Sequence, residues 1–190
     1  MDVSVLLPKI ALSLGIGITF GVWLHKYLHR DQTETLFFFG NTQYYHHTTN
    51  DQNDCDCRTC KSNTLIKWLN QAKHSLDICL CFITDETLTT TIIDAHKRGI
   101  KVRIILDEDC IRTTWKMGMA GIAKKVKKAK NSDSIMHHKF TIIDGKKVIL
   151  GSLNWTPKAL RKNWENTLIT NNAEVVRAYS KEFEKLWKQF

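Results

Sequence analysis

Apolar positions between residues 62 and 106 change from helical to strand spacing and back. One helix begins near Ser62 or Asn63, either of which can cap it. Its apolar positions recur every three or four residues on one face: Leu65, Trp68, Leu69, Ala72 and Leu76. The run 76–83 then predicts a short strand. A second helix is expected over 85–98, ended by the glycine that follows, and a strand over 100–106.

The carboxyl-terminal half repeats this alternation. Strands are predicted over 137–143 and 147–152 and around 166–170. The chain closes with a helix that begins near Ala173 and places six side chains on one face: Val176, Tyr179, Phe183, Leu186, Trp187 and Phe190. Strands that alternate with helices imply βαβ units and a largely buried sheet. The expected fold class is therefore α/β, an α/β sandwich with one central mixed sheet flanked by helices.

The first thirty residues have a different pattern. No charged residue occurs from Ile10 to Leu24, and an aromatic and basic flank follows. About 20 mostly apolar residues span a bilayer, and basic residues after the run favour an uncleaved anchor with the rest of the chain in the cytosol. We expect a transmembrane anchor over 1–30, a linker over 31–54 and a globular domain over 55–190. The alternative for the first segment is a hydrophobic docking helix.

The chain is basic. Its 190 residues include 28 Lys and Arg against 19 Asp and Glu, a formal charge of +9. Such a balance favours polyanionic partners, either nucleic acid or an anionic lipid surface. Within KKVKKAK the candidate substrate-binding cations are Lys124, Lys125, Lys127 and Lys128. The alternative is a solvated helix face, and too few aromatics interleave for a base-stacking platform.

The strand 137–143 carries candidate catalytic groups on one face. Alternate side chains of a strand share a face, so His137 and Lys139 are predicted to point one way. His138 and Phe140 point the other way, toward the core. The parity therefore makes His137 the candidate reactive histidine and His138 a structural one.

A tight turn should bring a second set of polar groups beside these two. With Gly145 at the first central position, the hairpin pairs His137 with Asn154 and Lys139 with Ser152. The alternative register pairs His137 with Ser152. Directly opposed side chains have Cβ atoms about 4.5–5.5 Å apart, so both registers gather the four residues on one face. Gly151 has no side chain, and we expect a ligand to approach the backbone there.

An imidazole, an ammonium, an amide and a hydroxyl at one point can hold a phosphate. Lys139 and Asn154 can stabilise the charge that develops on the non-bridging oxygens, and the imidazole of His137 can attack phosphorus. Because no carboxylate cluster for Mg²⁺ lies beside these residues, no catalytic metal is expected. The predicted chemistry is phosphodiester cleavage.

The pattern His137-x-Lys139-x₄-Asp144-x₆-Gly151-Ser152-x-Asn154 resembles the HKD motif of the phospholipase D superfamily. The surrounding MHHKF, GSLNWT and WENTLI are similar to its single-motif branch, called mitochondrial phospholipase D or Zucchini. The likeness covers most of residues 55–190. It implies the phospholipase D-like sandwich.

The resemblance also implies a double displacement. His137 would attack the phosphodiester and a second motif's histidine would protonate the leaving oxygen. Since this chain has one motif, the resemblance implies a two-fold homodimer with the active site across its axis. Glu165 matches the family's acidic residue that orients the imidazole, and Asp144 is expected to hold the turn rather than to transfer protons.

Three cysteines lie within six residues, at Cys55, Cys57 and Cys60, and Cys79 could complete a tetrahedral zinc site. The family's branch carries a small zinc site here, which implies a zinc-finger-like insertion near 55–81. Cys81 or a nearby histidine could replace Cys79, because strand parity does not separate the two cysteines. The alternative is a set of free thiols.

Two functions fit this chemistry. The resemblance implies an endonuclease that cleaves single-stranded RNA, such as piRNA precursors, on the cytosolic side of the mitochondrial outer membrane. The alternative is hydrolysis of cardiolipin to phosphatidic acid, with the lipids of that membrane as substrate. A lipase needs a continuous apolar channel, whereas a nuclease needs a basic cleft, so the charge of the chain favours the nuclease.

Overall fold

The structure is a computed structural model that describes residues 19–24, 31–38, 58–108, 114–128 and 134–190. The chain divides into two compact units, Met1–Gln32 and Thr33–Phe190. The strands of the second unit are β1 (Thr33–Phe38), β2 (Ser75–Leu80), β3 (Lys101–Asp107), β4 (Ala123–Lys127), β5 (Lys139–Ile143), β6 (Lys147–Gly151) and β7 (Glu165–Thr170). Its helices are α2 (Arg58–Asn70), α3 (Glu86–Lys97), α4 (Trp115–Met119), α5 (Pro157–Arg161) and α6 (Ala173–Gln189).

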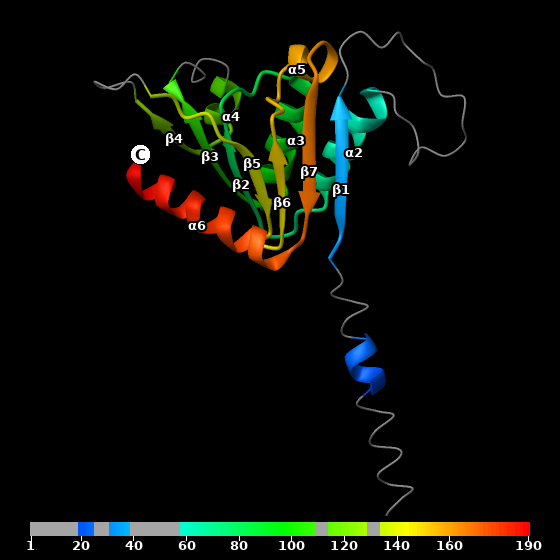
Figure 1. Cartoon of the computed structure of the whole chain (residues 1–190). Coiled ribbons are helices and arrows are strands. Elements are labelled where there is room, and N and C mark those ends of the chain that lie inside the picture. Colours follow the sequence, from blue (N-terminus) through cyan, green and yellow to red (C-terminus); the bar gives the residue numbers. More distant parts are fainter. Residues whose placement is uncertain (1–18, 25–30, 39–57, 109–113, 129–133) are drawn as a thin grey trace, which may run out of the picture. The chain divides into compact units, whose positions relative to one another are not determined.

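These strands form one mixed sheet in the order β1-β7-β6-β5-β2-β3-β4. The pairs β2–β3 and β3–β4 are parallel, and the other four pairs are antiparallel. Helix α6 crosses one face of the sheet, and α2 and α3 lie on the other face (Figure 1). The predicted α/β sandwich with a central mixed sheet is therefore confirmed.

Both faces of the central strands are buried, since each is covered by helices. In β5, Phe140 and Ile142 pack toward α6 with Phe183, whereas Ile143 belongs to the core beneath α2 and α3. Thr141, which shares a face of β5 with Lys139, has no exposed surface. Side chains of β5 alternate between the two faces of the sheet, as expected. Both faces are buried, although only the face that carries Phe140 was expected to be.

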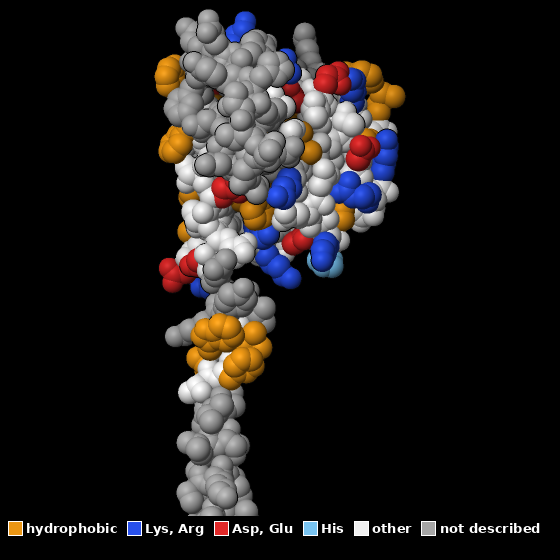
Figure 2. Space-filling view, turned by 90° about the vertical axis from the view of Figure 1, so that its right-hand side faces the viewer, with side chains coloured by type: hydrophobic (Ala, Val, Ile, Leu, Met, Phe, Trp, Pro, Cys, Tyr) orange, Lys and Arg blue, Asp and Glu red, His pale blue; other side chains and the backbone are white. Residues whose placement is uncertain are grey.

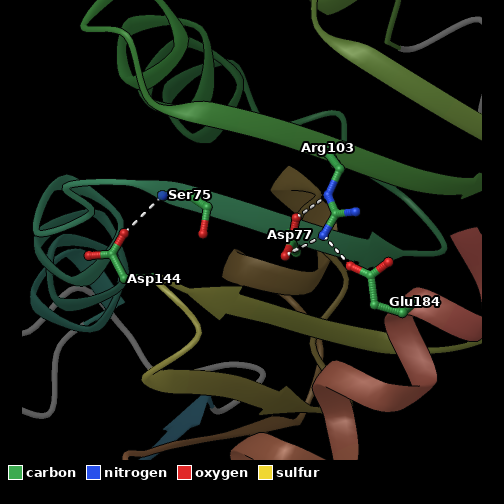
Figure 3. A network of polar contacts seen from close by, with 5 residues as sticks. All are labelled: Ser75, Asp77, Arg103, Asp144 and Glu184. Atoms are coloured by element: carbon green, nitrogen blue, oxygen red, sulfur yellow. Dashed lines mark hydrogen bonds and ion pairs between the residues drawn. The ribbon is translucent and has the colours of Figure 1, made fainter.

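A charged network fastens α6 to the sheet. Arg103 on β3 donates to Asp77 on β2, with Nε–Oδ1 at 2.7 Å, and to Glu184 on α6, with Nη2–Oε1 at 2.6 Å (Figure 3). The hydrogen bond from Arg103 lowers the pKa of Glu184. The same guanidinium lies 4.8 Å from the ring centroid of Phe183 and 5.3 Å from that of Trp187. Charge pairing and cation–π contact together fix the helix over β2 and β3.

The predicted linker contains a strand. Residues Thr33–Phe38 pair antiparallel with β7 and extend the sheet. Leu36 and Phe38 are 8% and 2% exposed in the core, and Trp68 Nε1 on α2 donates to Glu34 Oε2 at 2.8 Å. The domain thus begins earlier than residue 55. The interpretation of 31–54 as a linker is therefore wrong for Thr33–Phe38, because an alternating pattern of six residues is too short to indicate a strand. Residues 39–54 lie outside the described ones.

The lysine-rich run also contains a strand. Residues Ala123–Lys127 form β4, paired parallel with β3 at the edge of the sheet. The alternative of a solvated helix face is therefore wrong. Lysines on an edge strand hinder unwanted pairing with another chain, which is one reason for such a sequence at this position.

Most of the predicted anchor lies outside the described residues. Residues 19–24 are helical, and hydrophobic side chains gather on this helix (Figure 2), with Phe20, Val22, Trp23 and Leu24 all exposed. Among the helices that the structure describes, none has the length and apolar character needed to cross a membrane. The anchor remains a prediction.

The β5–β6 turn differs from the expected one by a single residue. Asp144 and Gly145 both have positive φ, 55° and 62°, and Lys146 N–H donates to the Ile143 carbonyl at 2.9 Å. Gly145 thus takes the second central position of the turn rather than the first, as Asp-Gly commonly does in this type of turn. In the strand register Ile143 pairs with Lys147 and Phe140 with Leu150, so both predicted registers are wrong.

Asp144 ties this turn to the beginning of β2. Its Oδ1 accepts from the N–H groups of His74 at 2.7 Å and Ser75 at 2.9 Å, and its Oδ2 accepts from Lys73 N–H at 3.0 Å (Figure 3 shows Ser75). Partial burial by itself would raise the pKa of Asp144, but these hydrogen bonds outweigh it and lower the pKa. The ionised carboxylate is therefore the form that holds the turn.

Replacing Asp144 should destabilise the fold in a pH-dependent way. Because its pKa is lowered in the folded state, its stabilisation is fully present above the ordinary carboxyl pKa of 3.8 and is lost as the pH falls through the folded pKa. Asp144→Asn should lose about 1–3 kcal/mol of unfolding free energy at pH 7, and the difference from the unsubstituted protein should shrink at pH 3. Urea denaturation at both pH values measures this.

The matched control is Asp94→Asn on α3, where the carboxylate makes only an exposed pair with Lys97 at 3.5 Å. Its effect should stay within about 0.5 kcal/mol. A pH-independent loss in Asp144→Asn, or an equal loss in the control, would contradict the role assigned to the carboxylate.

Candidate active site

The candidate catalytic residues meet at one edge of the sheet. Leu80, the last residue of β2, pairs with Lys139, the first of β5. Gly151 ends β6, and Glu165 begins β7. In Figure 1 this edge is the one toward which the arrow of β6 points. We call it the catalytic edge. Antiparallel strands bring these chain ends together although they are far apart in sequence.

His137 is exposed and lies just before β5. Lys139 is half-buried, and its Nζ donates to the His137 carbonyl at 2.9 Å. Met136, the residue before His137, is 4% exposed, and its N–H donates to Asp107 Oδ2 at 2.7 Å. The reactive histidine thus follows a residue that is fixed in the core. Asp107, at the carboxyl end of β3, was not predicted; its place at the end of a buried strand is the signal that could have found it.

His138 points to the other face of the sheet, as the parity argument expects. Its ring lies edge-on to Phe140 with centroids 5.7 Å apart, and its Nε2 is 3.9 Å from Glu182 Oε1 on α6. His138 therefore packs against the helix, which leaves His137 as the candidate nucleophile.

Ser152 and Glu165 are joined directly. Ser152 Oγ donates to Glu165 Oε2 at 2.5 Å and accepts from Asn166 N–H at 3.1 Å. Asn163 Nδ2 donates to Glu165 Oε1 at 2.9 Å. Both carboxylate oxygens are thus engaged, and within the described part of the chain Glu165 makes no hydrogen bond to His137. Asn163 is a further residue that sequence reasoning missed, because nothing in its spacing distinguishes it.

Asn154 lies in a loop that is held by backbone hydrogen bonds of the next residue. Trp155 N–H donates to the Phe82 carbonyl at 3.0 Å, and Thr84 N–H donates to the Trp155 carbonyl at 2.8 Å. Asn154 is half-buried, and its Oδ1 is buried with no hydrogen-bond partner in the described structure. Buried unsatisfied polar atoms are uncommon in native proteins and call for an explanation such as a functional role. Trp155 is only 2% exposed and packs in the core.

The fold itself requires a glycine at position 151, because the neighbouring strand leaves no room for a side chain. A Cβ at this position would lie 2.3 Å from the Asn166 carbonyl oxygen, and the φ of Gly151 is 151°. Strand β7 therefore passes directly against β6 where both reach the catalytic edge. The space that a side chain of residue 151 would occupy is thus taken by β7, and the approach of a ligand to this backbone stays a prediction.

Gly151→Ala should strongly destabilise the domain, because rigid backbone must move to admit the methyl group. We expect a loss of about 1–3 kcal/mol from overpacking, with added strain from the positive φ. The control is Gly118→Ala on α4, where the nearest atom is the flexible end of Lys124 at 2.8 Å. Thermal unfolding of both variants measures the difference, and equal stability would refute the close approach.

Asp144 does not lie at the catalytic edge. It follows the last residue of β5, whereas His137 precedes the first. Its carboxylate binds the amides of Lys73, His74 and Ser75 at the other end of the strand. Although it belongs to the catalytic motif, Asp144 acts on the site only through the register of the sheet.

The predicted zinc ligands do not come together as expected. Cys79 is fully buried on the α6 face, with Sγ 3.5 Å from Met136 Sδ, whereas Cys60 is on α2 on the opposite face. Burial, aided by the charge of Glu182, raises the pKa of Cys79 to about 12. The structure therefore does not bring Cys60 and Cys79 together as joint ligands, and the complete ligand set stays a prediction. Cys81 packs in the core beneath α2 and α3, so the structure separates the two cysteines.

The other candidate ligands lie outside the described residues: Cys55, Cys57 and the nearby histidines His46 and His47. Zinc binding therefore remains a prediction. Among the described residues, no group of three or more His, Cys, Asp or Glu could hold a metal ion.

The candidate substrate-binding lysines divide between two places. Lys124 Nζ donates to the Thr114 carbonyl at 3.2 Å, and Lys125 Nζ lies 5.6 Å from the Trp187 ring centroid. These two lie along β4 and make contacts within the fold. Lys127 pairs with Asp107 in the strand register, so Lys127 and Lys128 lie at the catalytic edge. Only these two of the four are placed to approach a substrate at that edge.

Comparisons with known proteins show the family to which the chain belongs. The family model described as "Cardiolipin synthase, PLD-like domain" matches residues 65–187. The chain is 31% identical over 193 residues to the mitochondrial cardiolipin hydrolase of Xenopus laevis, covering 96% of this chain and 90% of the relative. It is 38% identical over 127 residues to the human protein of that name, covering 66% of this chain and 50% of the relative.

Two solved structures have the same fold. NucT from Helicobacter pylori has a TM-score of 0.63 and 26% identity, covering 84% of this chain and 97% of that one. Nuc from Salmonella typhimurium, a phospholipase D family member, has a TM-score of 0.65 and 20% identity, covering 84% and 96%. At 20% identity, the likeness to Nuc shows only that the two chains share a fold.

The fold and the catalytic edge define a phosphodiesterase built on a mixed sheet with a histidine, a lysine and an asparagine at its edge. The chain belongs to the PLD-like domain family and so to the phospholipase D superfamily.

Proposed function

We propose that this enzyme is an endoribonuclease that cleaves single-stranded RNA through a phosphohistidine at His137 and leaves 5′-phosphate ends. The observation that supports the proposal is the catalytic edge itself. His137 and Lys139 at the start of β5, and the Ser152–Glu165 pair at the junction of β6 and β7, lie at the same ends of neighbouring strands. These groups suit a phosphodiester because they combine a nucleophile with donors for phosphate oxygens.

The first step forms a phosphorus–nitrogen bond. The neutral imidazole of His137 attacks phosphorus, and the bond between phosphorus and the leaving 3′-oxygen breaks. Lys139 and Asn154 donate to the non-bridging oxygens, which gain charge in the transition state. Lys139 is already aimed at this end of the strand by its hydrogen bond to the His137 carbonyl.

The second step releases the 5′-phosphate. A second histidine, which has given its proton to the leaving 3′-oxygen in the first step, accepts a proton from water as the water oxygen attacks phosphorus. The phosphorus–nitrogen bond breaks and His137 is regenerated. The chain has one motif of this kind, so His137 of the partner subunit would supply the second histidine in a two-fold dimer.

Exposed apolar side chains beside the site support such a dimer. Ile135, Phe82 and Trp164 are 60%, 37% and 72% exposed. They neighbour Met136, the end of β2 and Glu165 respectively. A second copy would cover them, and apolar and aromatic residues of this kind are enriched in the cores of interfaces. Glu165, held by Ser152 and Asn163, would then act as the group that orients an imidazole.

The charge of the edge favours RNA over lipid. Lys127 and Lys128 lie where β4 reaches the catalytic edge, and Lys139 lies within the site. A polyanion is attracted by such cations along its length, whereas a lipid presents one headgroup and needs an apolar channel beside it. An RNA of the piRNA-precursor kind is the substrate we propose.

Hydrolysis of cardiolipin is the second candidate, favoured by the name of the relatives that this chain matches over most of its length. That name also supports a mitochondrial location, and the outer membrane of that organelle is the location that we propose. The apolar segment over residues 10–24 would serve as the anchor, with the catalytic domain in the cytosol. Structural zinc bound by Cys55, Cys57 and Cys60 belongs to the same proposal.

Residues 31–190 should cleave single-stranded RNA in the presence of a chelator and leave 5′-phosphate ends. End-group analysis of the products, with RNA and cardiolipin offered in separate reactions, measures this. His137→Ala should lower turnover at least about 10³-fold, since it removes the nucleophile. Its thermal unfolding should be unchanged because the side chain is exposed.

His138→Ala is the control, because the neighbouring ring packs against α6 rather than at the site. It should retain most activity. Cleavage of cardiolipin but not RNA would replace the proposed function by the second candidate, and near-normal turnover in His137→Ala would refute the nucleophile.

Activity should also fall on dilution, in step with the dissociation of a dimer. Because each site needs histidines from both copies, turnover per chain should follow the dimer fraction measured by light scattering or analytical ultracentrifugation. Trp164→Glu should shift both curves to higher concentration, since a charge would lie in the proposed interface. Full activity in a dilute monomer would defeat the shared site.

A further inference from the structure

Helix α6 carries a row of cations on its outer face. Arg177, Lys181, Lys185 and Lys188 are all exposed and follow one another at intervals of four, four and three residues. At 3.6 residues per turn they lie along one side of the helix, opposite the buried Val176, Phe183 and Leu186. We call these four residues the basic stripe. With a rise of about 1.5 Å per residue it extends roughly 17 Å.

Of the three carboxylates on α6, Glu182 and Glu184 are already engaged, and Glu174 is exposed in the first turn. Glu184 binds Arg103 of the sheet at 2.6 Å, and Glu182 accepts from Lys185 at 3.5 Å and lies near His138. The neighbouring acids therefore neutralise the stripe only in part. Its surface is a net positive one that remains open to solvent along the helix.

The stripe approaches the catalytic edge. Glu182 lies 3.9 Å from His138, which is the residue next to the nucleophile, and Lys185 pairs with that same Glu182. Near the carboxyl end of α6, Trp187 lies beneath Lys125 of β4, whose strand ends in Lys127 at the catalytic edge. Positive charge on β4 thus adjoins the carboxyl end of α6 and reaches the catalytic edge at Lys127. Figure 1 shows α6 crossing the sheet to reach β4.

We propose that the basic stripe binds the phosphate backbone of single-stranded nucleic acid, beyond the phosphodiester held at His137. This inference rests on the proposed function and adds a second contact surface to it. Cations spaced about one helical turn apart match successive phosphates of an extended strand, and such contacts supply affinity without base preference.

An anionic membrane is the other polyanion to weigh. The apolar side of α6 is buried against the sheet, with Phe183 wholly enclosed. A helix that binds a membrane interface keeps its apolar side free to enter the headgroup region. Because α6 offers solvent only its polar side, a flexible strand of phosphates fits the stripe better than a lipid surface.

The test uses the full chain in detergent with Lys181→Glu and Lys188→Glu combined. Neither residue belongs to the catalytic edge. The KM for a long single-stranded RNA should rise about 10-fold or more, with kcat unchanged. Binding of fluorescent RNA should depend less on salt, its logarithmic slope falling by roughly 0.7 for each phosphate that no longer meets a cation. Hydrolysis of bis(p-nitrophenyl) phosphate, which is too small to reach α6, should not change.

The matched control combines Lys97→Glu and Arg98→Glu, at exposed residues near the end of α3 on the opposite face. It makes the same change in net charge. An equal effect in the control, or none in the α6 variant, overturns the proposal, as does an effect confined to anionic vesicles with RNA binding intact. If the unsubstituted enzyme does not cleave RNA, the proposed function fails, and the RNA-binding comparison still decides whether the stripe binds a strand.

Discussion

The Asp144 carboxylate holds the β5–β6 turn against the beginning of β2 by accepting from three consecutive amides, those of Lys73, His74 and Ser75. This contact sets how β5 lies against β2, and therefore that Lys139 meets Leu80 at the far end. A slip of one residue would turn every side chain of β5 to the opposite face. The aspartate of the catalytic motif thus determines the position of the chemistry from the other end of the strand.

At the catalytic edge, the candidate groups depend on neighbours that do not themselves meet a substrate. Asp107 fixes the residue before His137, and Asn163 and Ser152 share the oxygens of Glu165. Donors and acceptors held in advance cost little reorganisation during a reaction, which is how electrostatic catalysis gains its effect. The buried cores on the two faces of the sheet and the Arg103 network under α6 supply the rigidity that such positioning requires.

One chain supplies half of the proposed machinery. The single motif, the exposed Trp164 and Ile135 and the basic stripe all belong to surfaces that suit a bound partner. A second copy would complete the acid–base chemistry, and a polyanionic strand would join the site to α6. A chemically simple site is suited to this arrangement, because the proposed reaction needs few groups and specificity can come from what lies around them.

Local patterns were enough to predict the alternation of helices and strands, the parity that separates His137 from His138, and the motif spacing that identifies the family. Periods of 2 and 3.6 residues record such features directly in the order of the amino acids. Contacts between distant segments set the rest. They made a strand of Thr33–Phe38 by pairing it with β7, excluded a side chain at Gly151 through the backbone of Asn166, and put Cys60 and Cys79 on opposite faces. These contacts depend on which strands become neighbours in the sheet, and no local pattern encodes that order.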